Sequence, residues 1–165
     1  MAGNMRKPRV EFSTNTYSNT DLLSESEIYK TLDIWAKSHN YAYLGPDLKI
    51  EQAINSDVGY KILIDGVLIS PYEHSSYLIE AKGNGANSTE LLEGYTKLLL
   101  AVYYEYQKQI INNKAGLLVS NGWQIENFIA DYGDALKFLK QNIPIGFMKV
   151  WNTSAIPYIE IIWDW

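Results

Sequence analysis

Three charged residues interrupt two otherwise apolar segments of this chain of 165 residues. Asp65 directly follows the apolar run Ile62–Ile64, and Glu80 and Lys82 lie two positions apart at the end of Tyr77–Lys82. Side chains two apart on a β-strand point to the same face, so we expect Glu80 and Lys82 to lie together. The spacing therefore predicts a small charged site on an apolar sheet.

The segment between the two runs reads as a hairpin loop, since Ser70–Ser75 contains Pro71 and mostly polar residues. If Ser70 and Ser75 lie opposite each other, counting outward along an antiparallel hairpin brings Asp65 opposite Glu80. All three charged side chains would then converge on one face.

Two facing carboxylates among apolar residues repel each other and are costly to bury. A divalent cation removes this cost, and two carboxylates with a backbone carbonyl, for which Ala81 is the candidate, suit Mg²⁺ or Mn²⁺. Such an ion activates water and neutralises a phosphate group. Lys82 would orient or deprotonate the attacking water and balance the developing charge. The alternative is an ion pair on an edge strand, which would give the same triplet without chemistry.

The elements expected to position these residues alternate between helical and strand patterns. The first helix begins at Ser24, where Glu27 stands three residues on in a capping-box pattern, and runs to about Asn40. A long apolar helix capped by Ser88 or Thr89 packs on the sheet. A further helix is expected over 124–141, with a possible interruption at Gly133. The expected strands are Leu48–Ile54, Tyr60–Ile69, Ser76–Lys82, Ala115–Ser120, Gly146–Trp151 and Tyr158–Trp163.

The composition favours one folded domain preceded by an arm. Residues 1–23 are polar and begin with basic side chains, which is typical of a flexible arm, and residues 24–165 form the predicted domain. A disordered tail without function explains the arm equally well.

At the charged triplet the sequence resembles the PD-(D/E)XK nuclease superfamily, whose fold is restriction-endonuclease-like. The family has an Asp on its second core strand, matched by Asp65, and a (D/E)-x-K motif on the third, matched by Glu80-Ala81-Lys82. The resemblance covers residues 24–120 and implies an α/β fold with an αβββαβ core, a mixed central sheet flanked by helices and an extra C-terminal helix and strands. It also implies hydrolysis of DNA phosphodiester bonds with Mg²⁺ or Mn²⁺.

Members of the family often complete the metal shell with a Glu on the first helix. Glu27 matches that position, with Glu25 as its rival, and Glu51 is a third candidate. One departure concerns the family's Pro-Asp dipeptide: Ile64 precedes Asp65, and the Pro46-Asp47 dipeptide lies in a turn ahead of the expected strands.

The charge and composition limit the function classes. Fourteen Lys and Arg against nineteen Asp and Glu give a net charge of −5, which argues against coating nucleic acid by bulk charge but allows a local metal-mediated contact. The absence of cysteine excludes disulfides and thiolate zinc sites, and with no signal or membrane-spanning pattern it predicts a cytoplasmic protein. Duplex cleavage by one small site per chain predicts a homodimer that uses the aromatic end, Tyr158–Trp165. The competing hypothesis is a non-catalytic nucleic-acid-binding or structural protein with the same fold.

Overall fold

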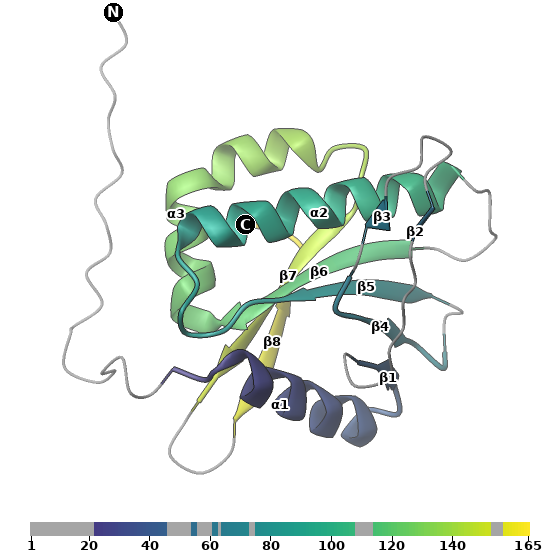
Figure 1. The fold of residues 1–165 in the computed structure, drawn as a ribbon, viewed down its shortest axis with the longest axis vertical. Coiled ribbons are helices and arrows are strands. Elements are labelled where there is room, and N and C mark those ends of the chain that lie inside the picture. Colours follow the sequence, from purple (N-terminus) through teal and green to yellow (C-terminus); the bar gives the residue numbers. More distant parts are fainter. Residues whose placement is uncertain are drawn as a thin grey trace, which may run out of the picture.

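The computed structural model describes residues 22–45, 54–55, 61–62, 64–72, 75–107, 114–152 and 157–165. They form a mixed α/β fold in which helices cover both faces of a six-stranded sheet (Figure 1). The elements are α1 (Glu25–Ser38), β1 (Ala42–Leu44), β2 (Ile54–Asn55), β3 (Lys61–Ile62), β4 (Gly66–Ile69), β5 (Ser76–Ala81), α2 (Ser88–Gln107), β6 (Lys114–Asn121), α3 (Gly122–Leu139), β7 (Ile145–Trp151) and β8 (Tyr158–Ile162).

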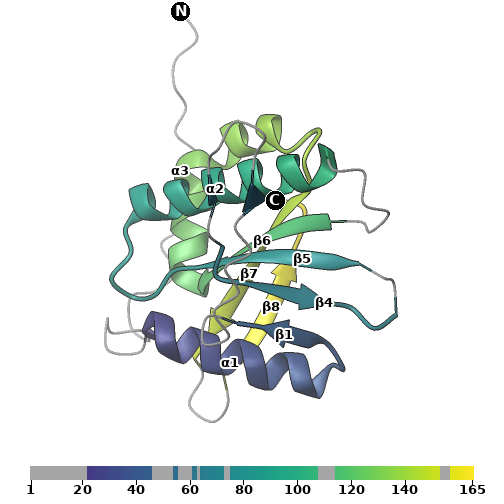
Figure 2. The same cartoon turned by 45° about the vertical axis from the view of Figure 1, so that its right-hand side comes forward.

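The six-stranded sheet has the order β1-β4-β5-β6-β7-β8. Its first three strands are antiparallel neighbours, β5, β6 and β7 are parallel, and β8 returns antiparallel to β7. The parallel steps require crossover connections, which α2 and α3 provide. The short β2–β3 ladder is separate from this sheet and lies beside α2 (Figures 1 and 2).

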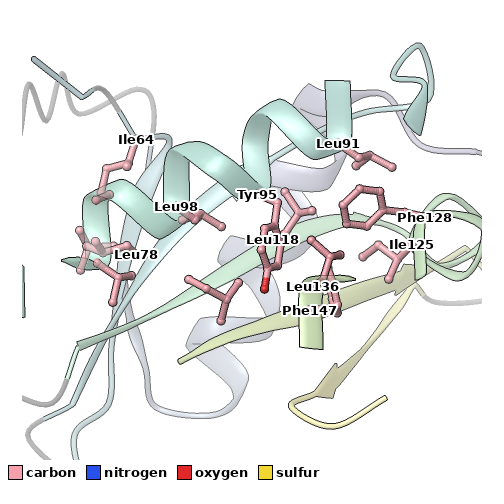
Figure 3. Close-up of a cluster of buried hydrophobic side chains, with 14 residues drawn as sticks. Ile64, Leu78, Leu91, Tyr95, Leu98, Leu118, Ile125, Phe128, Leu136 and Phe147 are labelled. Carbon is pink, nitrogen blue, oxygen red and sulfur yellow. The ribbon is translucent and has the colours of Figure 1, made fainter. Parts of the chain in front are cut away.

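Each face of the sheet has its own apolar core because side chains alternate along every strand. The core under α2 and α3 includes Leu98, Leu118 and Phe147 (Figure 3). The core under α1 includes Ile28 and Leu32 from the helix, which pack with the strand residues that point to this second face. The central strands β5 and β7 are therefore mostly buried on both faces, and a charged residue there needs a partner.

The predicted hairpin register is confirmed. Ser70 N donates to Ser75 O at 3.0 Å, and β4 pairs with β5 from Ile69 opposite Ser76 to Gly66 opposite Ile79. The ladder ends at that pair: Asp65 lies beyond it and its N–H donates to Ile79 O at 2.9 Å, so the expected direct pairing of Asp65 with Glu80 is not part of the ladder. The capping box at Ser24 and Glu27 is also present, and β7 and β8 lie within one residue of their predicted bounds.

Several sequence-based boundaries were wrong. The expected strand Tyr60–Ile69 is instead two strands in different sheets, β3 and β4, because Ile64 and Asp65 lie between them outside either ladder. The edge position beside β4 is taken by β1, whose pairing with β4 no local pattern revealed. The cap of α2 is Asn87 rather than Ser88 or Thr89.

At that cap, Asn87 Oδ1 accepts from Glu90 N at 3.0 Å and Glu90 Oε2 accepts from Asn87 N at 2.8 Å. The pair is a capping box built on Asn in place of the expected Ser or Thr. Helix α3 begins at Gly122 and continues through Gly133, where an interruption was expected.

Residues 1–21 of the expected arm and most of the expected strand Leu48–Ile54 lie outside the described residues. At the end of the arm, Leu23 is buried and bonded to β6, so it belongs with the folded domain. None of the helices in the described part of the chain is both long and apolar enough to cross a membrane.

Candidate active site

Asp65 is held at the open end of the β4–β5 hairpin. It directly precedes β4, and its N–H donates to Ile79 O at 2.9 Å. Its carboxylate Oδ2 accepts a hydrogen bond of 2.9 Å from Ala81 N. The half-buried carboxylate therefore takes the place of a strand carbonyl at the end of the ladder, directly beside the backbone of Ala81.

Glu80 lies on β5 with its side chain toward α2, and only 2% of its surface is exposed. Burial raises its pKa above the ordinary value, and the negative charge of Asp65 raises it further. Two lysines act in the opposite direction: Lys97 Nζ donates to Oε1 at 3.0 Å, and Lys82 Nζ lies 3.3 Å from the same oxygen. Asp65 and Glu80 are thus close enough to interact, as the sequence predicted, but their repulsion is partly compensated.

Lys82 directly follows β5 and is fixed through its backbone, since Lys82 N donates to Val119 O at 2.9 Å. Its partial burial acts to lower its pKa, but the neighbouring carboxylates of Glu80, Asp65 and Glu25 outweigh that effect, so the pKa is raised. Lys82 is therefore an ammonium ion at neutral pH in the metal-free protein, suited to orienting water and balancing negative charge.

Lys97 was not anticipated from the sequence, because a lysine on a long helix reads as a surface residue. In the structure its Nζ lies 2.8 Å from Glu80 Oε2 as well as 3.0 Å from Oε1. Gly94, one turn earlier on α2, allows this approach: a Cβ there would come within 3.2 Å of Glu80 Cγ and 3.4 Å of Lys82 Cε. A glycine inside a helix costs about 1 kcal/mol relative to Ala, so Gly94 was the available signal of a close approach.

The first turn of α1 carries two carboxylates, Glu25 and Glu27. Glu27 is exposed, and its Oε2 accepts from Ser24 N and Ser24 Oγ, each at 2.8 Å. Glu25 lies nearer the charged triplet: its charge acts on Lys82, and its backbone packs against Gly83, where a Cβ would come within 2.2 Å of Glu25 N. The capping role of Glu27 is therefore visible, and the rival Glu25 is the α1 carboxylate beside the site.

Tyr29 bonds to Glu25 and is close enough to Asp65 to be affected by its charge. Its hydroxyl donates to Glu25 Oε1 at 3.0 Å, and its pKa is raised by burial, then by the charge of Asp65, and then by Glu25. Tyr29 was not anticipated because it reads as one more aromatic residue of an amphipathic helix.

A buried polar network joins the segments around Lys82. Ser120 Oγ donates to Lys82 O at 2.7 Å, and Gln124 Nε2 donates to Gly83 O at 2.9 Å. Asn121, which is 1% exposed, accepts from Leu23 N at 2.8 Å and donates to Leu23 O at 2.9 Å. The end of β6 thereby fixes both the loop after Lys82 and the chain entering α1. The sequence suggested only a strand end at Asn121.

The donor set suits a hard divalent cation. Asp65, Glu80 and the Ala81 carbonyl offer oxygen alone, the ligand type that Mg²⁺ and Mn²⁺ prefer. Glu80 Oε2 is buried without a hydrogen bond from the described residues, because Lys97 Nζ is near it but aligned with Oε1. No group of three or more His, Cys, Asp or Glu side chains suited to a metal occurs in that part of the chain. A metal here would thus rest on two carboxylates and backbone or water oxygens.

Glu51 and the Pro46-Asp47 dipeptide lie outside the described residues. Comparison with protein-family models, curated proteins and solved structures found no match to this chain. The geometry of the charged cluster is therefore the basis for assigning a function.

Proposed function

We propose that this protein is a metal-dependent nuclease that hydrolyses DNA phosphodiester bonds, using Asp65, Glu80, Ala81 and Lys82. The observation that carries the proposal is the buried Glu80 carboxylate, which lies 3.3 Å from Lys82 Nζ and close enough to Asp65 for that charge to raise its pKa, at the open end of the β4–β5 hairpin. Burying acidic groups together is costly, and such arrangements concentrate at functional sites.

The topology supports a restriction-endonuclease-like core. Helix α1, the antiparallel strands β1, β4 and β5, helix α2 and the parallel strand β6 follow the αβββαβ order, with β2 and β3 inserted after β1. Asp65 then directly precedes the second strand of this core, whereas the superfamily has its Asp on that strand. Glu80 and Ala81 end the third strand, and Lys82 directly follows it.

In the proposed reaction, Asp65, Glu80 and the Ala81 carbonyl would hold Mg²⁺ or Mn²⁺. The bound ion would supply a more acidic water and a positive charge for the phosphate. Lys82 would orient the attacking water and stabilise the negative charge that develops on the phosphorane oxygens. Glu25, or Glu27 as first matched by sequence, would accept a hydrogen bond from that water. We propose that the active form is a homodimer, because cutting both strands of a duplex needs two sites. We also propose that the protein is cytoplasmic, as its composition predicts.

A specific observation favours a second candidate, a non-catalytic nucleic-acid-binding or structural protein. Lys82 and Lys97 already balance the charge of Glu80 and Asp65 without a metal. In that case the cluster would be an ion-pair network that fixes α2 on the sheet.

Cleavage of plasmid, linear, single-stranded and branched DNA with Mg²⁺ or Mn²⁺ separates the two candidates. We expect metal-dependent nicking or cutting by the wild type, and its loss in Asp65→Ala, Glu80→Ala and Lys82→Ala. Removal of one catalytic group should lower the rate at least about 100-fold. Retained activity in all three folded variants would show that these residues do not form the active site.

The same assay decides between the two carboxylates of α1. Glu25→Gln should lower the cleavage rate, whereas Glu27→Gln should leave it unchanged, because Gln at this position still supports a capping box. The opposite result would return the role to Glu27.

A further inference from the structure

Helix α2 is shaped to bring one more cation to the site. Gly94 and Lys97 are three positions apart and therefore share a face of the helix. The missing Cβ of Gly94 lets the helix approach Glu80 and Lys82, and Lys97 uses that approach to place its ammonium within 3.0 Å of both Glu80 oxygens. The contact between Lys97 and Glu80 therefore depends on the close packing of α2 that Gly94 allows.

The formal charges of the four residues Asp65, Glu80, Lys82 and Lys97 balance before any metal is present, and Glu25, whose charge acts on Lys82 from α1, adds one more negative charge beside them. Asp65 and Glu80 carry two negative charges, and Lys82 and Lys97 carry two positive charges. A divalent ion bound to the two carboxylates would neutralise them by itself, so both ammonium groups would be surplus. That surplus matches a phosphodiester under attack, which carries one negative charge and gains a second as hydroxide adds to phosphorus.

Lys97 is free to leave Glu80, whereas Glu80 is not free to leave the sheet. One third of the Lys97 side chain is exposed, compared with 2% of Glu80. The lysine stem is flexible and carries a point charge, so its ammonium can swing toward solvent while the helix stays in place.

We propose that Lys97 occupies the metal's place at Glu80 in the metal-free protein and becomes a phosphate-binding residue once the metal is bound. This inference rests on the proposed metal site. It predicts that metal and Lys97 compete for Glu80, so the free protein binds metal more weakly than it would without the Lys97 charge. It also predicts that metal and DNA strengthen each other's binding, since the released ammonium becomes available to a phosphate.

The test measures Mn²⁺ binding by calorimetry in the absence of DNA, for the wild type and for Lys97→Met, which keeps the apolar stem and removes the charge. Lys137→Met, an exposed lysine on α3, is the matched control. We expect Lys97→Met to bind Mn²⁺ about tenfold more tightly than the wild type, a typical size for coupling between sites, and the control to match the wild type. Lys97→Gln provides a second variant if the methionine variant does not fold.

Duplex binding, measured by fluorescence anisotropy with Ca²⁺ as a metal that suppresses cleavage, gives the other half of the test. Here Lys97→Met should bind more weakly than the wild type, opposite in direction to its effect on Mn²⁺. Unchanged or weaker Mn²⁺ binding by Lys97→Met, with clear binding by the wild type, would overturn the role of Lys97 and leave the proposed metal site standing. Absence of Mn²⁺ binding in all the proteins would overturn the metal site, and the inference with it.

Discussion

Glu80 is almost completely buried, and two lysines rather than one approach its carboxylate. The sequence led us to expect unrelieved repulsion between Glu80 and Asp65, because it gave no sign of Lys97. The lysines reduce that repulsion but do not cancel the cost of burial, since the pKa of Glu80 is still raised. The ionised carboxylate is thus a local source of instability in the metal-free protein.

This instability has a defined pH dependence. The unfolded chain titrates Glu80 near its ordinary pKa of 4.5, whereas the native pKa is higher because of burial and then Asp65. Between those two values the native state binds more protons than the unfolded state, so the free energy of unfolding falls as the pH rises. Below the unfolded pKa, Glu80 is protonated in both states, so the free energy of unfolding no longer depends on pH through this group.

We therefore expect the unfolding free energy of the wild type, minus that of Glu80→Gln, to fall as the pH rises from 4.5 and to level off once native Glu80 is ionised. Urea unfolding of both proteins in a chelating buffer, from pH 4.5 to neutral pH, measures this difference. A difference that grows with pH would mean that Lys82 and Lys97 stabilise the charged form more than burial penalises it.

At the scale of elements, the end of β6 holds three segments together. Asn121 satisfies both backbone groups of Leu23, 98 positions away, and donates to Gln124 Oε1 at 2.8 Å. Gln124 and Ser120 bond the backbone carbonyls of the loop after β5. The position of Glu25 relative to Lys82 depends on this network, because the bonds to Leu23 fix the chain just ahead of α1.

Replacing Asn121 with Ala should lower the free energy of unfolding by about 3 kcal/mol, since it removes hydrogen bonds and leaves buried backbone groups of Leu23 without partners. Asn127→Ala, an exposed position on α3, is the matched control and should change stability by no more than about 0.5 kcal/mol. Urea unfolding of both variants measures the effect. Equal small losses would show that water satisfies Leu23 when Asn121 is absent.

At the scale of the whole molecule, β1 and β8 form the two edges of the six-stranded sheet. Two large aromatic groups lie at this end of the chain: Tyr158 on β8 is 51% exposed, and Trp163, directly after β8, is 37% exposed. An edge strand offers unpaired backbone groups to a second chain, and aromatic side chains are enriched at interfaces. These features support the proposed homodimer through the C-terminal strand.

Light scattering at high micromolar concentration should therefore give the mass of a dimer for the wild type. Tyr158→Lys should shift the mass toward that of a monomer, because it brings a charge into the proposed interface. Phe138→Lys is the control, since Phe138 is 72% exposed but lies on α3. A monomeric wild type would exclude the dimer, and a dimer broken equally by both variants would move the interface away from β8.

Much of the site geometry was predictable because it is local in sequence. The loop at Ser70–Ser75 sets the register of one hairpin, and that register brings Asp65 to the end of β5 that carries Glu80. The capping box of α1 and the bounds of β7 and β8 are likewise encoded within a few residues. Such features depend on neighbouring side chains and the local backbone, so they can be predicted from a short stretch of sequence.

The contacts that tertiary structure decided join segments far apart in the chain. Lys97 meets Glu80 only because α2 crosses the sheet with Gly94 against it, and Asn121 meets Leu23 only because β6 ends beside the start of α1. The helical pattern of α2 allows a surface lysine at position 97 as readily as a buried partner. Which of these it becomes depends on how the helix packs on the sheet, and packing is set by the combined burial of both apolar cores rather than by any local motif.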